Sequence, residues 1–91
     1  MSPKDTRGLR VFVLDEYAPE ISDPEARDRF FISLAIISLH YRQFGKMPWH
    51  PHRKARNCYR AVRKRVQGAN EAKQMKSFNL WTLEMAQKAL H

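Results

Sequence analysis

Seven lysine and arginine residues fall within thirteen positions in the middle of this chain, with no acidic residue among them. They are Arg53, Lys54, Arg56, Arg60, Arg63, Lys64 and Arg65. On a helix, at about 100° per residue, five of them share one side: Arg53, Arg56, Arg60, Arg63 and Lys64. Like charges on successive turns cost roughly 0.2–0.5 kcal/mol per pair. Because the planar guanidinium group binds phosphate through paired donors, the pattern predicts a phosphate-binding surface on a helix over residues 52–67.

The charge of the chain is divided unevenly, which allows a second interpretation of this basic run. Residues 1–39 hold five Lys and Arg against seven Asp and Glu, a net charge of −2, whereas residues 40–91 hold twelve against two, a net charge of +10. A one-sided field favours anionic partners. The acidic residues of the first third can instead neutralise the basic run from within the chain or from a second copy. These are Asp15, Glu16, Glu20, Asp23, Glu25 and Asp28.

Residues on either side of the basic run are candidates for selectivity. The proline-rich loop before it carries Trp49 and leads to His52, and Trp49 either anchors the loop in the core or stacks on an exposed base. After a Gly-Ala-Asn turn, Lys73, Gln74 and Lys76 lie near the start of the next expected helix, as in a helix-turn-helix. A ribbon-helix-helix built on residues 9–14 is disfavoured, since neither face of that ribbon is polar enough to read a groove.

Metal-binding and catalytic patterns are absent from the sequence. His50, His52 and Cys58 lack the paired spacing of zinc ligands, and Cys58 falls on an apolar stripe, which indicates a buried structural thiol. There is no glycine-rich phosphate loop and no nucleophile motif. We therefore expect neither a cofactor nor a metal, and no enzyme activity.

Three segments carry helical patterns. Asp23, Pro24 and Gly45 delimit a central helix over 23–45, because Asp caps a first turn, Pro suits the first helical position and Gly favours the stop. The basic helix over 52–67 and a third helix over 70–90, which a cap at Ser77 or Asn79 would divide in two, complete the set. Residues 1–22 are expected to form an extended arm, with a short strand over the β-branched run 9–14.

The central helix has apolar residues on two sides. One stripe contains Phe30, Leu34 and Ile37, and a second, nearly opposite, consists of Ile32, Ile36 and Leu39. Other helices can cover the first stripe. The second stripe needs the N-terminal arm, another protein or a second copy to cover it.

These patterns predict one all-α domain over residues 1–91, a small bundle of three main helices, or four if the third is divided. The expected function is non-catalytic binding of DNA or RNA. The alternative is a small interaction or inhibitor protein that docks on an acidic protein surface, such as a phage or mobile-element product acting on a host nucleic-acid machine. With no apolar signal core and an apolar stripe on the basic helix too thin for a bilayer, we expect a cytoplasmic protein without membrane binding.

Overall fold

A computed structural model describes residues 6–18, 22–66 and 68–91 of the chain. In chain order the elements are α1 (Thr6–Glu16), α2 (Pro24–Phe44), α3 (Arg53–Arg65), the short 3₁₀ helix η2 (Gly68–Asn70) and α4 (Glu71–Leu90). Every regular element within these ranges is helical, so the all-α class is confirmed. Glu20 and Gln67, which the sequence placed in the acidic first third and at the end of the basic helix, lie outside the described residues.

The N-terminal segment is a helix, so the predicted strand over residues 9–14 and extended arm are wrong where the structure describes them. A strand would place Leu9, Val11 and Val13 on one face. Instead Leu9 and Val13 are buried while Val11 is 50% exposed, which is the pattern of a helix. A short apolar run fits both the two-residue period of a strand and the 3.6-residue period of a helix. Here no neighbouring strand is present among the described residues, and packing against α3 and α4 selects the helix.

The ends of α2 follow from local chemistry, as the sequence predicted. The Asp23 side chain accepts a hydrogen bond from the Glu25 backbone N–H at 3.2 Å, and Pro24 occupies the first turn. At the other end Gly45 adopts a left-handed conformation with φ of 72°, and its N–H donates to the Tyr41 carbonyl at 2.7 Å. A residue with a Cβ is strained in that conformation, so glycine stops the helix here.

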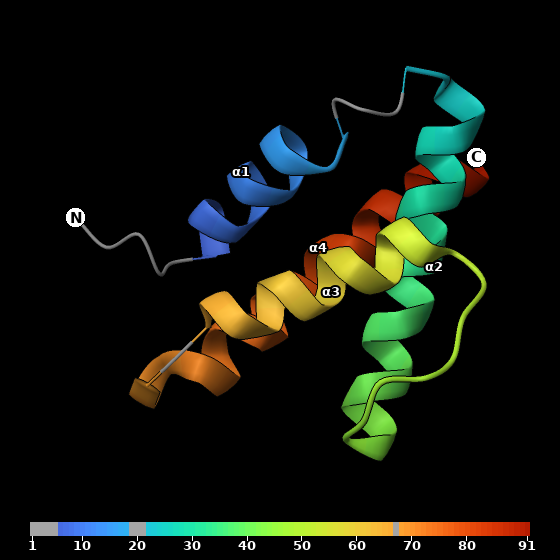
Figure 1. Ribbon diagram of the computed structural model, residues 1–91. Helices are drawn as coiled ribbons and strands as arrows, with labels where there is room; N and C mark the ends of the chain where they lie inside the picture. Colours follow the sequence, from blue (N-terminus) through green and yellow to red (C-terminus); the bar gives the residue numbers. More distant parts are fainter. Residues whose placement is uncertain (1–5, 19–21, 67) are drawn as a thin grey trace.

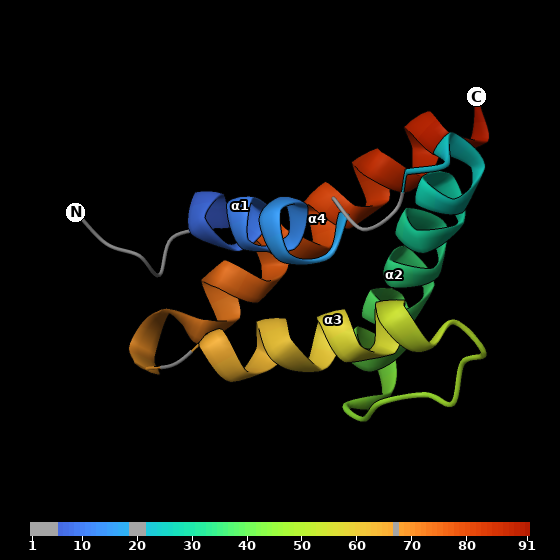
Figure 2. The ribbon, with the colours of Figure 1, turned by 45° about the horizontal axis from the view of Figure 1, so that its top comes forward.

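The four α-helices enclose one core. From the η2 turn, α3 and α4 diverge; α1 lies over the opening between them, and α2 crosses both near their far ends (Figures 1 and 2). The third predicted helix is undivided, so the fourth helix of the bundle is α1. The largest fully buried side chains include Phe30, Phe31, Tyr59 and Phe78, which come from α2, α3 and α4. This core fixes α3 with one side inward and the opposite side in solvent.

Cations of α1 and α3 also pack on aromatic rings from neighbouring helices. The Arg65 guanidinium carbon lies 4.0 Å from the centre of the Phe12 ring, and that of Arg10 lies 6.0 Å from the Trp81 ring. A guanidinium group over an aromatic face contributes about 0.5–1 kcal/mol at exposed sites. These contacts tie α1 to both helices beneath it.

Candidate nucleic-acid interface

The basic helix α3 is amphipathic, and its apolar side is completely buried. Ala55, Cys58, Tyr59 and Val62 have no exposed surface. Arg53, Arg60 and Lys64 lie on the opposite side, about half a turn away from this buried stripe, whereas Arg56 and Arg63 lie at its margin and are half-buried. The sequence therefore oriented α3 correctly.

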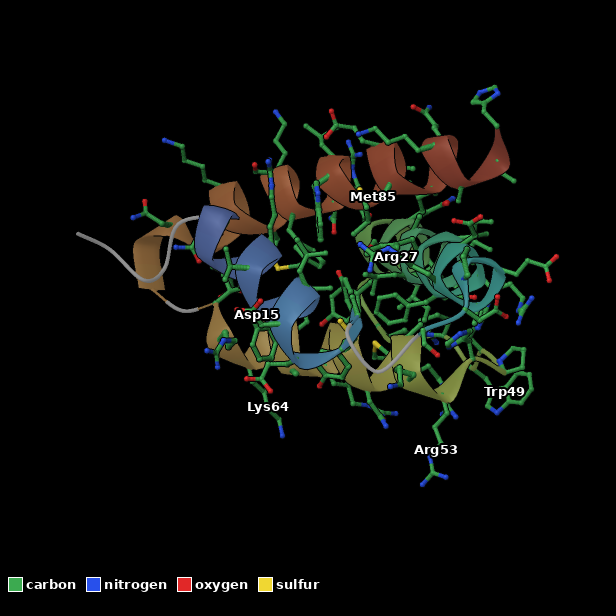
Figure 3. All side chains as sticks on the ribbon, turned by 90° about the horizontal axis from the view of Figure 1, so that it is seen from above. Asp15, Arg27, Trp49, Arg53, Lys64 and Met85 are labelled. Atoms are coloured by element: carbon green, nitrogen blue, oxygen red, sulfur yellow. The ribbon has the colours of Figure 1, made fainter. Side chains whose placement is uncertain are left out.

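Three of the five predicted residues, Arg53, Arg60 and Lys64, are exposed. Figure 3 shows Arg53 and Lys64 near opposite ends of α3, both projecting away from the other helices. Arg60 lies between them in the sequence, and its Nη1 lies 3.4 Å from the amide oxygen of Asn57 in the same helix. Arg56 is half-buried, and its Nε makes no hydrogen bond. Together these residues form an arginine- and lysine-rich surface along one helix, which we call the α3 basic face.

Arg63 is engaged within the fold. Its guanidinium carbon lies 4.2 Å from the centre of the Tyr41 ring, and its Nη2 lies 3.4 Å from a carboxylate oxygen of Glu71. Burial raises the pKa of Tyr59, and the charge and hydrogen bond of Arg63 oppose that rise. One of the five predicted phosphate ligands is thus a bridge between α2, α3 and α4.

Acidic residues at the end of α1 and the start of α4 lie beside cations of α3. Glu71 pairs with Arg63, because the η2 turn brings the start of α4 back beside the end of α3. Glu16, at the end of α1, lines a surface hollow with Arg53 and Lys54. Sequence reasoning missed Glu71; its position just after the turn, eight residues beyond Arg63, was the available signal. Asp23, in contrast, is engaged as the cap of α2.

The loop before α3 presents Trp49 to solvent. This indole is 81% exposed, so it does not anchor the loop in the core. It lies at the same end of α3 as Arg53 (Figure 3). An exposed aromatic ring beside a cation has the chemistry of a stacking platform for an unpaired base.

His52 has a structural role. Its Nδ1 accepts a hydrogen bond from the Ala55 backbone N–H at 3.2 Å, which caps α3, and its ring packs edge-on against Phe30. The backbone N–H of His52 in turn donates to Nδ1 of His50 at 3.0 Å. Burial is the largest cause that lowers the pKa of His52, and the positive charges of Arg29 and Lys54 lower it further. A neutral ring is what capping through Nδ1 requires.

The residues expected to read bases from α4 are divided between surface and core. Lys73 and Lys76 are exposed, whereas Gln74 is buried and its side-chain oxygen makes no hydrogen bond. The α3–η2–α4 arrangement keeps the order of a helix-turn-helix. However, α4 packs extensively against α2, and Gln74 is buried. Of the three α4 residues expected to contact bases, Lys73 and Lys76 are therefore the two that a ligand can reach.

Neither a metal-binding cluster nor a membrane-spanning helix occurs among the described residues. In the described ranges no group of three or more His, Cys, Asp or Glu side chains is arranged to hold a metal ion. Cys58 is buried, and burial raises its pKa to about 12. None of the helices in the part of the chain that is described combines the length and apolar character needed to cross a bilayer.

The second apolar stripe of α2 faces outward. Ile36 is 48% exposed and Leu39 is 43% exposed, while Ile32 is half-buried beside the loop residues His50 and Pro51. The described part of the N-terminal segment, residues 6–18, therefore leaves Ile36 and Leu39 uncovered.

Comparisons of the chain with protein-family models, with curated proteins and with solved structures found no match.

Proposed function

We propose that this protein binds DNA or RNA without catalysing a reaction, through the α3 basic face. The observation that carries the proposal is that Arg53, Arg60 and Lys64 are all exposed along one helix whose opposite side is buried. The C-terminal end of a helix favours cations, whereas its N-terminal end disfavours them. Arg53 lies in the first turn of α3, so the helix dipole gives it no stabilising role there. A phosphate bound to Arg53 would give this cation a stabilising role.

Trp49 extends the α3 basic face beyond phosphate contacts. Because the indole is solvent-exposed and lies at the same end of α3 as Arg53, it can stack on an unpaired base of a strand whose phosphates contact the arginine. Lys73 and Lys76, on the exposed side of α4, are further candidates for contact with the nucleic acid. This arrangement favours single-stranded regions over uniform duplex.

A salt titration tests the function. We expect the affinity for labelled single- and double-stranded oligonucleotides to fall steeply with salt, by about 0.7–0.9 log units per log unit of salt for each neutralised phosphate. The triple variant Arg53→Gln/Arg60→Gln/Lys64→Gln should reduce that slope by about 2–3 units. Lys88→Gln, which removes one exposed charge from the last turn of α4, is the control for the effect of each lost charge on the slope. No binding at low salt, or equal slopes for wild type and triple variant, would overturn the proposal.

A second candidate function, binding of an acidic protein surface, is favoured by the exposure of Ile36 and Leu39 together with the basic face. A pull-down with and without nuclease separates the two functions. A protein partner held directly survives the digestion, whereas one bridged by nucleic acid is lost.

A further inference from the structure

The uncovered face of α2 has the spacing of a coiled-coil seam. Positions along it are separated by four and three residues in alternation: Glu25, Arg29, Ile32, Ile36, Leu39 and Gln43. This repeat of about 3.5 residues keeps a stripe facing a second helix along its length. All six positions are exposed except Ile32, which is half-buried. The three central positions are apolar, and the outer ones are polar or charged.

The charges beside this seam select an antiparallel partner helix. In a parallel pair of identical helices each residue faces its own copy, so Arg29 would oppose Arg29 and Glu25 would oppose Glu25. In an antiparallel pair Ile32 packs against Ile36 of the second copy, and the flanking Asp28 faces Arg42 of the second copy. The twofold axis repeats this contact, which gives two opposite-charge pairs per dimer. Asp28 and Arg42 are both exposed and so are available for it.

The middle of the seam also suits close approach of two helices. Ser33 and Ala35 flank Ile32 and Ile36 there, and both are small side chains already covered by the chain's own packing. Ser33 and Ala35 themselves therefore do not hold the second helix away at the twofold axis, and the loop residues His50 and Pro51 flank Ile32 on the Ser33 side. Arg29 and Leu39 lie at equal distances on opposite sides of the twofold axis, so Arg29 faces Leu39 of the second copy. The aliphatic part of the Arg29 side chain can pack on that leucine.

We propose that this protein forms a symmetric homodimer in which the Ile32, Ile36 and Leu39 stripes of two α2 helices pair in antiparallel orientation. Burial of six apolar side chains supplies the association free energy, and the Asp28–Arg42 pairs fix the direction. The side chains of the α3 basic face are not part of this seam. A dimer therefore carries two such faces, and the pairing stands independently of what they bind.

Sedimentation equilibrium over a range of protein concentrations tests the pairing. The wild-type chain should show a monomer–dimer equilibrium, and Ile36→Lys should raise its dissociation constant by at least about 30-fold, since each dimer loses two buried isoleucines and gains two buried charges. Leu80→Lys is the matched control, because Leu80 is 51% exposed on α4 and lies outside the seam. Circular dichroism of both variants checks that they are folded.

A charge exchange tests the direction of the pairing. Asp28→Arg and Arg42→Asp should each weaken self-association by about tenfold, because each replaces two attractive pairs with two repulsive ones. An equimolar mixture of the two variants should dimerise as the wild type does, since both pairs then have opposite charges again. A wild-type chain that remains monomeric at every concentration overturns the proposal and leaves the seam to a different protein. A dimer that is insensitive to Ile36→Lys, or a mixture that is no stronger than its components, overturns it as well.

Discussion

The guanidinium group of Arg63 lies over the ring of Tyr41, at 4.2 Å from the ring centre, and pairs on another side with Glu71 at 3.4 Å. These contacts join the second half of α2, the last turn of α3 and the first turn of α4 through one side chain. Arg63 is also only partly exposed, with 29% of its side chain accessible. It therefore differs from Arg60, one turn earlier on the same helix, whose guanidinium group is exposed and contacts Asn57 within α3.

This difference predicts that Arg63→Gln mainly lowers stability, whereas Arg60→Gln mainly weakens nucleic-acid binding. Arg63→Gln should lower the free energy of unfolding by about 1–2 kcal/mol, because it removes a cation–π contact and an ion pair. Arg60→Gln should change stability by less than about 0.5 kcal/mol but weaken nucleic-acid binding more than Arg63→Gln does. Urea denaturation and an anisotropy titration of the two variants measure both quantities. Equal losses of stability would show that Arg63 does not join the three helices.

Local patterns predicted the helices whose ends depend on neighbouring residues. Asp23, Pro24 and Gly45 mark α2 because capping, the φ of proline and a left-handed stop act over a few residues. The apolar stripe through Cys58 and Val62 likewise oriented α3, since the period of a helix assigns its two faces wherever it packs.

The features that the sequence did not predict depend on residues far apart in the chain. The run 9–14 suits either a strand or a helix, and only its packing on α3 and α4 decides between them. The contact of Arg63 with Tyr41 requires the crossing of α2 and α3, which no local pattern specifies. Whether Trp49 anchors or projects depends on whether the folded core has room for it.

Cys58 should be unreactive until the protein unfolds. Burial raises its pKa to about 12, and the thiolate is the reactive form. The thiol is therefore protected both because reagents cannot reach it and because it stays protonated. A thiol reagent at about pH 8 should label the native chain very slowly and the urea-unfolded chain at the rate of a free cysteine. Because Cys58 is the single cysteine of the chain, the labelling reports one site. Rapid labelling without denaturant would contradict its burial in the core.

The cap of α3 should make stability depend on pH. The folded-state pKa of His52 lies below 6.5, chiefly because of burial, so the folded state binds a proton less readily than the unfolded state. Its contribution is then complete above about pH 6.5 and is lost as the pH falls through 6.5 towards the lower folded-state pKa. We expect the urea midpoint to drop between about pH 8 and pH 5.

A substitution that keeps the cap separates His52 from the other histidines. His52→Asn preserves a side-chain acceptor for the Ala55 N–H, so the variant should lose part of the pH dependence while remaining stable at about pH 8. His52→Ala should cost about 0.5–2 kcal/mol at the higher pH, where the cap is fully formed. If wild type and His52→Asn show the same pH profile, the dependence comes from another group.

Trp49 should report single-stranded nucleic acid directly. The chain has two tryptophans, and Trp81 is only 7% exposed whereas Trp49 is 81% exposed, so a base stacking on the protein surface quenches mainly Trp49. We expect single-stranded oligonucleotides to quench the fluorescence and Trp49→Phe to abolish most of that quenching. Trp49→Ala should reduce single-strand affinity by roughly 1–3 kcal/mol and duplex affinity much less, because only unpaired bases expose a face for stacking. Equal losses for both nucleic acids would assign Trp49 to backbone contact and leave the α3 cations as the whole of the interface.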